Sequence, residues 1–203
     1  MKNIFIIIFF SNTIFSQEAE EFVVNPRNNW FFGIEIGNNK ITSFSFDEPK
    51  NYFQVGLLAE YYFAKHWSAT ARVKYFKTGL SFIKSASYGT FKGAVISVPL
   101  NIKWEYRIVK NFSGNFKLGI ALNNEVESNY DYSQNSKTDY DKSFTSFNSG
   151  LGFNYFLNKK MSIYGEYESY IWGNDRDESD FLEIEPNSTN NNLINFGIKY
   201  NFK

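Results

Sequence analysis

Apolar and polar side chains alternate with a period of two along nearly the whole chain after Trp30. This alternation indicates β-strands, because successive side chains of a strand point to opposite faces, and helical spacing is weak throughout. Several runs exceed the usual length of about five or six residues and match the roughly 9–11 residues of a tilted transmembrane strand. The eight runs cover residues 30–38, 52–64, 67–77, 94–106, 115–125, 143–156, 161–172 and 192–202.

The connections between these runs alternate in length. Those after the second, fourth and sixth runs are short, at residues 65–66, 107–114 and 157–160. Those after the first, third, fifth and seventh runs are long and polar, as in residues 128–142 and 173–191. Short turns at one end of a sheet and long loops at the other are the layout of an outer-membrane barrel.

Each run has one apolar face and one face rich in charge and glycine. In the third run, Val73 and Tyr75 share a face with Trp67, while Arg72 and Lys74 share the opposite face. Two folds fit eight such strands: a soluble ligand-binding barrel has the apolar face inside, and a membrane barrel has it outside. Glycines on the polar faces leave space for long charged neighbours, at Gly56, Gly119, Gly150, Gly152 and Gly197.

The aromatic residues favour the membrane barrel. They gather near strand ends on the apolar face, as the girdles at the two membrane interfaces do. Closure of the sheet also satisfies every backbone group in lipid. We therefore predict an all-β fold, an eight-stranded antiparallel up-and-down transmembrane β-barrel. The residues of the two girdles are Trp30, Phe63, Trp67, Trp104, Tyr155, Tyr200 and Phe202 near the short connections, and Tyr75, Ile171 and Trp172 near the long ones.

Length and composition fit one exported domain. The chain has 203 residues with 21 basic and 21 acidic side chains, and this balance argues against a nucleic-acid partner. Cysteine is absent, which excludes disulfides and thiolate chemistry. Lys2, the apolar stretch at residues 4–10 and a cleavage point after Ser16 are typical of a signal peptide. We expect a signal peptide at 1–16, a short periplasmic segment at 17–29 and the barrel at 30–203.

The charged residues of the polar faces number five of each sign. An eight-stranded barrel is just wide enough for side chains to fill it, and an unpaired buried charge is very costly. We therefore predict a lumen plugged by paired charges. Glu166 and Glu168 share a face and suit a glycosidase pair by spacing, but nothing indicates a sugar-sized cleft. The predicted network is Glu35, Glu60, Arg72, Lys74, Lys103, Glu105, Lys117, Glu166, Glu168 and Lys199.

Two further candidate sites, at His66 and in the acidic stretch at residues 173–191, fit solvent-exposed roles better than chemical ones. His66 is the single histidine. It lies in a short turn two residues from Ser68 with no acid nearby in sequence, which disfavours a catalytic triad. Asp175 and Asp177 begin like a calcium loop, but the glycine that the turn requires is missing, so we expect a solvated acidic loop. No metal and no cofactor is predicted.

The stretch NFGIKYNF, with Asn195, Gly197, Tyr200 and Phe202, resembles the C-terminal assembly signal of outer-membrane barrels. The signal usually ends on the aromatic residue, whereas Lys203 follows here. The stretches VPLNIKWEY and MSIYGEYESY likewise resemble strands of the outer-membrane-protein β-barrel domain family, the small eight-stranded porin-family barrels similar to OmpA and OmpX. This resemblance implies a Gram-negative outer membrane and assembly by the barrel-assembly machinery.

We predict a monomeric, non-enzymatic protein in outer-membrane lipid, with a structural or surface-interaction role carried by its long loops. An extracellular protein or glycan is the expected partner. A small gated pore is the main alternative. A barrel enzyme that modifies lipid or glycan, and a soluble ligand-binding barrel, are the others.

Overall fold

The computed structural model describes residues 25–42, 48–49, 51–84, 87–132, 143–172 and 190–202, which form antiparallel strands. No helix in these described segments is long and apolar enough to cross a membrane. The strands are β1 (Trp30–Thr42), β2 (Glu48–Pro49), β3 (Asn51–Tyr62), β4 (Trp67–Lys84), β5 (Ser87–Val109), β6 (Phe112–Tyr132), β7 (Ser143–Phe156), β8 (Met161–Trp172) and β9 (Asn190–Asn201).

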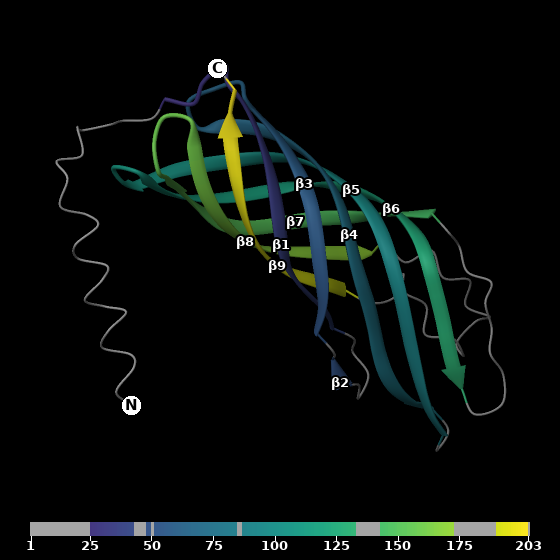
Figure 1. Ribbon diagram of the computed structural model, residues 1–203. Coiled ribbons are helices and arrows are strands. Elements are labelled where there is room, and N and C mark those ends of the chain that lie inside the picture. The colour runs from purple at the N-terminus through teal and green to yellow at the C-terminus, as the bar shows by residue number, and fades with distance from the viewer. Residues whose placement is uncertain are drawn as a thin grey trace, which may run out of the picture.

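Eight of these strands close into a barrel. They run in the order β4-β3-β1-β9-β8-β7-β6-β5, and β4 pairs with β5 to complete the circle, while the two-residue β2 adds only to β4 (Figure 1). The first and last long strands are neighbours, with Glu35 opposite Gly197. Every barrel strand therefore has a partner on both sides, which is what backbone groups in lipid require. The predicted fold class is confirmed.

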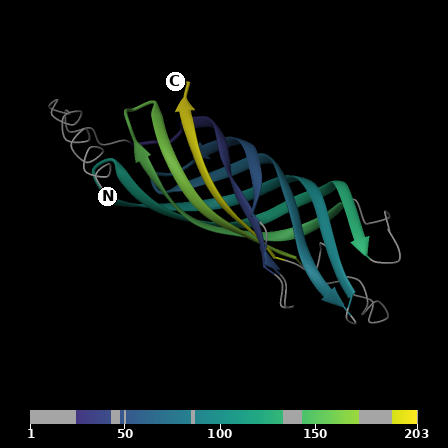
Figure 2. The ribbon, with the colours of Figure 1, turned by 60° about the horizontal axis from the view of Figure 1, so that its bottom comes forward.

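The barrel has two different ends. The short connections between β3 and β4, β5 and β6, and β7 and β8 lie at one end, where β9 also finishes (Figure 2). We call this the short-turn end and the opposite one the loop end. The alternation of short and long connections thus gives the molecule a polarity. The first residues of β4, β6 and β8 lie near the short-turn end.

The apolar faces lie on the outside of the barrel. Large apolar side chains such as Ile34, Leu57 and Leu151 are 59%, 61% and 65% exposed. Their sequence neighbours on the opposite face, such as Glu35, are buried. A soluble barrel would have the reverse arrangement, so that alternative is wrong. The apolar wall is the surface that lipid would cover.

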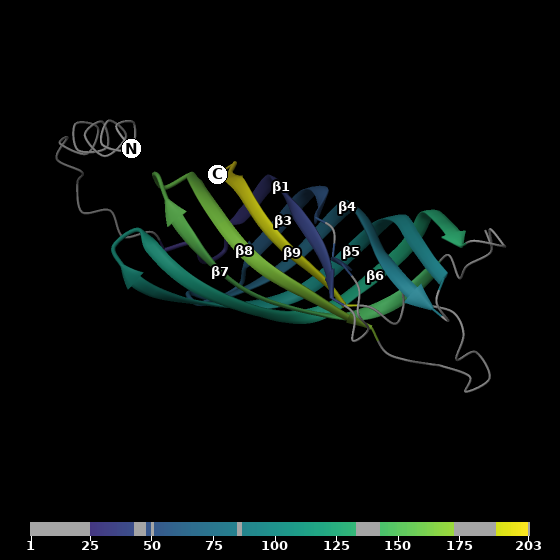
Figure 3. The same ribbon diagram turned by 90° about the horizontal axis from the view of Figure 1, so that it is seen from below.

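One predicted loop is instead a paired extension of the sheet. The connection after the third run was expected to be long and polar, but β4 and β5 remain paired as far as Lys84 opposite Ser87. β6 continues beside β5 to the pair of Tyr132 with Gly89. Residues 80–91 include Leu, Ile, Phe and Tyr, which favour strands when a neighbouring strand is available. β4, β5 and β6 consequently project past the other strands (Figure 3).

The interior also contains apolar layers that the polar-face rule did not predict. Phe31, Tyr62 and Phe156 pack together at the short-turn end. A second cluster lies toward the loop end, so the charged residues are enclosed from both sides. It consists of Phe76, Val95, Ala121, Tyr170 and Leu193.

Candidate functional site

The ten charged side chains predicted to face the lumen all lie inside the barrel and are buried. They form two groups, each with equal numbers of positive and negative charges. The central cluster is Glu35, Arg72, Lys74, Lys117, Glu166 and Glu168. The short-turn cluster is Glu60, Lys103, Glu105 and Lys199.

Each cation of the central cluster contacts more than one carboxylate. Lys74 Nζ lies 2.7 Å from Glu35 Oε1 and 2.7 Å from Glu168 Oε2. Lys117 Nζ lies 2.6 Å from Glu166 Oε2 and also contacts Glu168. Arg72 Nη2 donates to Glu166 Oε2 at 2.7 Å, and this bond crosses the lumen from β4 to β8. Three carboxylates and three cations therefore form one neutral network.

Glycine on the intervening strand makes the contacts between these strands possible. Gly56 on β3 is the register partner of Glu35 on β1 and of Lys74 on β4. A Cβ atom at Gly56 would lie 2.9 Å from Glu35 Oε1 and 3.2 Å from Lys74 Cγ, so a larger residue would displace them. The two long side chains thus meet over the strand that separates them.

The short-turn cluster centres on Glu60 and Glu105. Lys199 Nζ lies 2.6 Å from Glu60 Oε2, and Lys103 contacts both carboxylates. Neutral donors complete the shell: Tyr62 donates its hydroxyl to Glu105 Oε2 at 2.9 Å. Ser68 and Ser113 donate to Glu60 and Glu105, respectively, and the Asn154 amide also donates to Glu105.

Aromatic rings close this cluster on the short-turn side. Lys199 Nζ lies 5.4 Å from the ring centre of Tyr62 and 5.5 Å from that of Phe31, within the range of cation–π attraction. Phe156 lies 6.0 Å from the same ammonium group. The cations are thus held by carboxylates on one side and rings on the other.

This arrangement favours structural pairing over acid–base chemistry. Glu166 and Glu168 each contact at least two cations, which leaves neither carboxylate poised to exchange a proton with a substrate. A buried charge without its partner is strongly destabilising, whereas a neutral, hydrogen-bonded cluster is tolerated. The two glutamates of YGEYESY are therefore part of the paired-charge network of the lumen.

A polar strip accompanies the network along β5 and β6, beyond the charged residues of the predicted network. Asn101 and Asn115 have buried side-chain amides without a hydrogen-bond partner among the described residues, and the Ser97 hydroxyl likewise has none. These residues alternate with the apolar residues of their strands just as the charged residues do, so the period-two pattern places them on the inner face. Short polar side chains are compatible with water in this part of the lumen.

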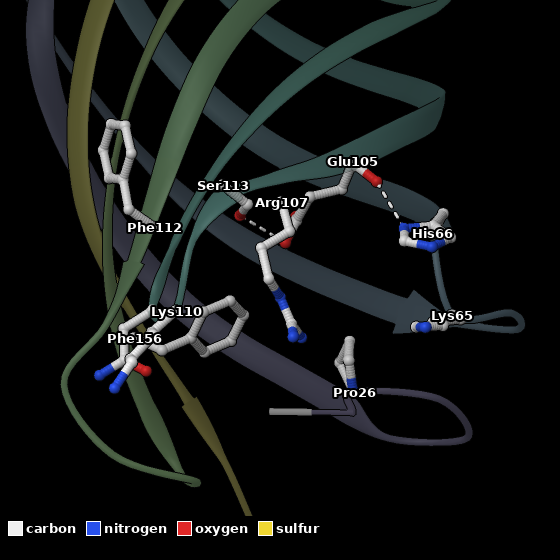
Figure 4. A pocket seen from close by; sticks show the side chains of 10 residues that line it. Pro26, Lys65, His66, Glu105, Arg107, Lys110, Phe112, Ser113 and Phe156 are labelled. Carbon is white, nitrogen blue, oxygen red and sulfur yellow. Dashed lines mark hydrogen bonds between the residues drawn. The ribbon is translucent and has the colours of Figure 1, made fainter. Parts of the chain in front are cut away.

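His66 lies at the rim of a pocket at the short-turn end (Figure 4). Its Nδ1 lies 3.0 Å from the Glu105 carbonyl oxygen, and the Glu105 N–H donates to the His66 carbonyl oxygen at 2.8 Å. The Glu105 carboxylate turns inward and accepts from Ser113 at 2.8 Å. Ser68 donates to Glu60, so His66, Ser68 and an acid do not form a triad. The pocket has a cavity volume of about 30 Å³ and is lined by Pro26, Lys65, His66, Glu105, Arg107, Lys110, Asn111, Phe112, Ser113 and Phe156.

The predicted assembly signal forms most of β9 and alternates between the two faces. Asn195 is buried and accepts a hydrogen bond from Gln54 Nε2 at 2.5 Å. Gly197 leaves space for Tyr164, whose hydroxyl a Cβ would approach to 2.5 Å. Tyr200 and Phe202 are exposed on the apolar wall with ring centres 5.2 Å apart. Their role as a signal remains a prediction.

The acidic loop considered as a calcium site lies at residues 173–189, outside the described residues. Within the described segments, no group of three or more acidic or histidine side chains is arranged to hold a metal ion.

Sequence and structure comparisons agree on the kind of protein. The model of the outer membrane protein beta-barrel domain family matches residues 14–202. Among curated protein sequences, none matches this chain. The outer membrane protein OprG from Pseudomonas aeruginosa is similar in structure, with a TM-score of 0.58, 14% identity and coverage of 88% of this chain and 99% of that chain.

Two other solved barrels are similar at the level of the fold. Neisserial surface protein A has a TM-score of 0.57, 12% identity and coverage of 85% of this chain and 97% of its own. Ail, the attachment invasion locus protein of Yersinia pestis, has a TM-score of 0.53, 19% identity and coverage of 87% and 99% in a complex with the heparin analogue sucrose octasulfate.

Proposed function

The chain belongs to the outer membrane protein beta-barrel domain family, and we propose that it is a monomeric recognition protein of the cell surface and not an enzyme. It is a β-barrel protein of the cell outer membrane. The observation that carries the proposal is the sheet of β4, β5 and β6 beyond the barrel. This sheet continues as paired strands beyond the lipid-covered wall.

The exposed residues of these strands change character along their length. Val73 on β4 and Ile96 on β5 are exposed apolar residues of the wall. Farther toward the loop end, charged side chains are exposed at Lys77, Lys92 and Glu127, although Val126 is exposed as well. A lipid-facing surface would not carry such charges at successive strands. The extension therefore suits an aqueous environment at the cell surface.

The extension also has an open edge. β6 pairs with β7 only as far as Asn124 opposite Ser143, whereas its pairing with β5 continues to Tyr132. Among the described residues, the β7-facing side of β6 has no strand partner from Glu125 onward. Exposed strand edges bind extended peptides by strand addition, with the backbone supplying affinity and alternate side chains supplying specificity.

Charge indicates the kind of partner. Glu127 is exposed on this edge, and residues 173–189 contain six carboxylates and one arginine. Ail was crystallised with a sulfated heparin analogue. The acidic loop end of the present chain disfavours a polyanion of that type, so we favour an extracellular protein with a basic, extended segment over a sulfated glycan.

A binding experiment tests this proposal. The refolded full chain in lipid nanodiscs is presented with extended peptides that alternate lysine and valine, and with matched peptides that contain glutamate. Asn129→Pro should weaken binding of the lysine peptides, because proline disrupts the edge. Asn129→Ala is the control. Equal binding by both variants, or preference for the glutamate peptides, would reject recognition by this edge.

The lumen is proposed to be closed to solutes. Two neutral clusters of paired charges and two apolar layers support this view. The small pore remains the second candidate, because the polar strip with Ser97, Asn101 and Asn115 provides a hydrophilic wall. Conductance steps of the native protein in planar bilayers would favour the pore. The non-enzymatic role, monomeric state and assembly by the barrel-assembly machinery belong to the same proposal.

A further inference from the structure

Basic side chains surround the short-turn end of the barrel. They occur on the segment before β1 and on the three short connections, and all are exposed. In the described part of this end, the carboxylates of Glu60 and Glu105 are both buried in the lumen. The basic residues, here called the basic rim, are Arg27, Lys65, Arg107, Lys110, Lys159 and Lys160.

The basic rim begins where the apolar wall ends. Lys65 lies between Phe63 and Trp67, which are 43% and 42% exposed. Arg107 directly follows the exposed Tyr106 and precedes the exposed Ile108. Aromatic rings favour the depth of the lipid headgroups, and long basic side chains extend from this depth toward phosphate. The rim therefore lies at the level of the headgroup phosphates of one leaflet.

The two ends of the molecule differ in charge although the chain is neutral overall. The loop-end segment at residues 173–189 has six carboxylates against one arginine, whereas the described short-turn end exposes only basic charges. An anionic lipid surface consequently attracts the short-turn end and not that acidic segment. In outer-membrane barrels the short turns face the periplasm.

The basic charges are concentrated on one side of the rim. Lys65, Arg107 and Lys110 line the same pocket, which Figure 4 shows at the mouth of the barrel. Trp67 and Trp104 are register partners on the adjacent wall. Three basic side chains and two indoles thus occur on neighbouring strands, where a phosphate and the upper part of an acyl chain would be bound together.

We propose that the basic rim binds anionic phospholipids of the periplasmic leaflet through their phosphate groups. The interaction anchors and orients the barrel from the side opposite to its acidic loops. It rests on the membership of the outer-membrane family and is independent of the recognition proposed for β6. Its partner is a bilayer lipid, as distinct from free phosphate or a protein.

Tryptophan quenching by brominated lipids measures this preference directly. The chain has four tryptophans, and Trp172→Phe leaves Trp30, Trp67 and Trp104, all near the short-turn end. The full chain is reconstituted in phosphatidylcholine bilayers that contain a fixed fraction of brominated phosphatidylglycerol or brominated phosphatidylcholine. We expect phosphatidylglycerol to associate with the barrel about fivefold more strongly than phosphatidylcholine does. This factor corresponds to the attraction of about one basic residue to an anionic surface.

Neutral substitutions identify the residues responsible. Arg27→Gln, Lys65→Gln and Lys160→Gln together should reduce the preference at least twofold, and substitution of the whole rim should abolish it. The control combines Lys40→Gln, Lys77→Gln and Lys92→Gln, three exposed positions nearer the loop end, and should retain the preference. Heat-dependent gel mobility verifies that each variant is folded.

The remaining outcomes contradict the proposal. Equal quenching by the two lipids, or a preference that survives loss of the whole rim, would exclude binding of anionic lipid at this end. A preference for the anionic lipid that appears only when Glu18, Glu20 and Glu21 are changed to Gln would indicate that the basic rim instead binds that acidic stretch of the chain. Free phosphate should compete no better than chloride at equal ionic strength, because the bilayer supplies the ligand.

Discussion

Lys117 and Glu168 form an ion pair across Gly150, which is the register partner of both residues. A Cβ atom at Gly150 would lie 2.8 Å from Lys117 Cε, so the glycine is a requirement of the pair. The same relation joins Glu35 and Lys74 around Gly56. Glycine on the middle strand and opposite charges on its neighbours therefore act as a unit.

Enlarging these glycines should destabilise the barrel. Gly150→Val is expected to lower the free energy of unfolding by about 1–3 kcal/mol, because overpacking displaces Lys117 from Glu168. Urea titration of the refolded protein in lipid vesicles, monitored by tryptophan fluorescence, measures the change. Ser149→Val is the control, since residue 149 belongs to the outer face. Equal effects of the two substitutions would show that the pair does not depend on the glycine.

Removing one charge should cost more than removing a balanced pair. Glu168→Gln leaves Lys74 and Lys117 with fewer carboxylates and should lower the free energy of unfolding by about 3–5 kcal/mol. Lys117→Met combined with Glu168→Gln restores neutrality and should cost less than the sum of the single substitutions. A double-mutant cycle of unfolding free energies tests this coupling, and strict additivity would argue against it.

Substitution of Glu166 and Glu168 also distinguishes a structural role of these residues from a role in binding. Replacing both by glutamine should lower barrel stability and leave recognition at the β6 edge unchanged, because the network is buried inside the barrel. Unfolding titrations and peptide binding are measured on the same variant. Loss of binding with unchanged stability would restore an active-site interpretation of YGEYESY.

A conductance measurement tests the closed lumen. Changing Lys74, Lys117, Glu166 and Glu168 to serine keeps the charge balanced and removes the long side chains from the centre of the lumen. We expect the native protein to show no conductance steps in planar bilayers. Because both apolar layers remain in the variant, steps in its recordings would show that the central cluster is what closes the lumen. Substitution of four exterior residues, Val73, Phe116, Tyr167 and Ile171, by leucine is the matched control and should remain silent.

How far the sequence predicted the structure depends on the kind of interaction involved. Period-two alternation identified the strands because every strand separates lipid from lumen, and the bounds of residues 143–156 and 161–172 agree with β7 and β8. It failed at residues 78–93, where cross-strand pairing continues β4 and β5 beyond the predicted runs.

The sequence does not predict which charged residues contact each other within the lumen, and the reason is different. Parity places Arg72 and Glu166 inside, but their 2.7 Å contact joins strands that are not neighbours. Such a contact depends on the stagger of all strands around the barrel, which no local pattern encodes. The interior rings of Phe31 and Phe76 share parity with the charges, but a rule that assigns polar residues to the inner face does not predict them.

The C-terminal aromatics should matter more for assembly than for stability. Phe202 is 72% exposed and contacts the rings of Tyr200 and Phe32, so Phe202→Ala removes little buried surface. We expect it to slow the appearance of the folded, heat-modifiable form in cells several-fold while the free energy of unfolding changes by less than about 1 kcal/mol. Deletion of Lys203 is the control. A normal assembly rate for Phe202→Ala would reject the signal.

The extension of β4 and β5 should be dispensable for folding. Thr78 and Gly93 are register partners, so residues 79–92 can be replaced by an Asn-Gly turn that joins the two strands directly. The hydrogen bond from Thr78 Oγ1 to Asn191 Oδ1, at 2.9 Å, remains available at the loop end of the lumen. The shortened barrel should therefore unfold at nearly the native urea concentration.

Binding of basic extended peptides should be lost, because β6 beyond Glu127 then has no strand beside it to hold its edge in place. Retained binding would place the recognition surface elsewhere, and a large loss of stability would mean that the extension is part of the barrel and not a platform on it.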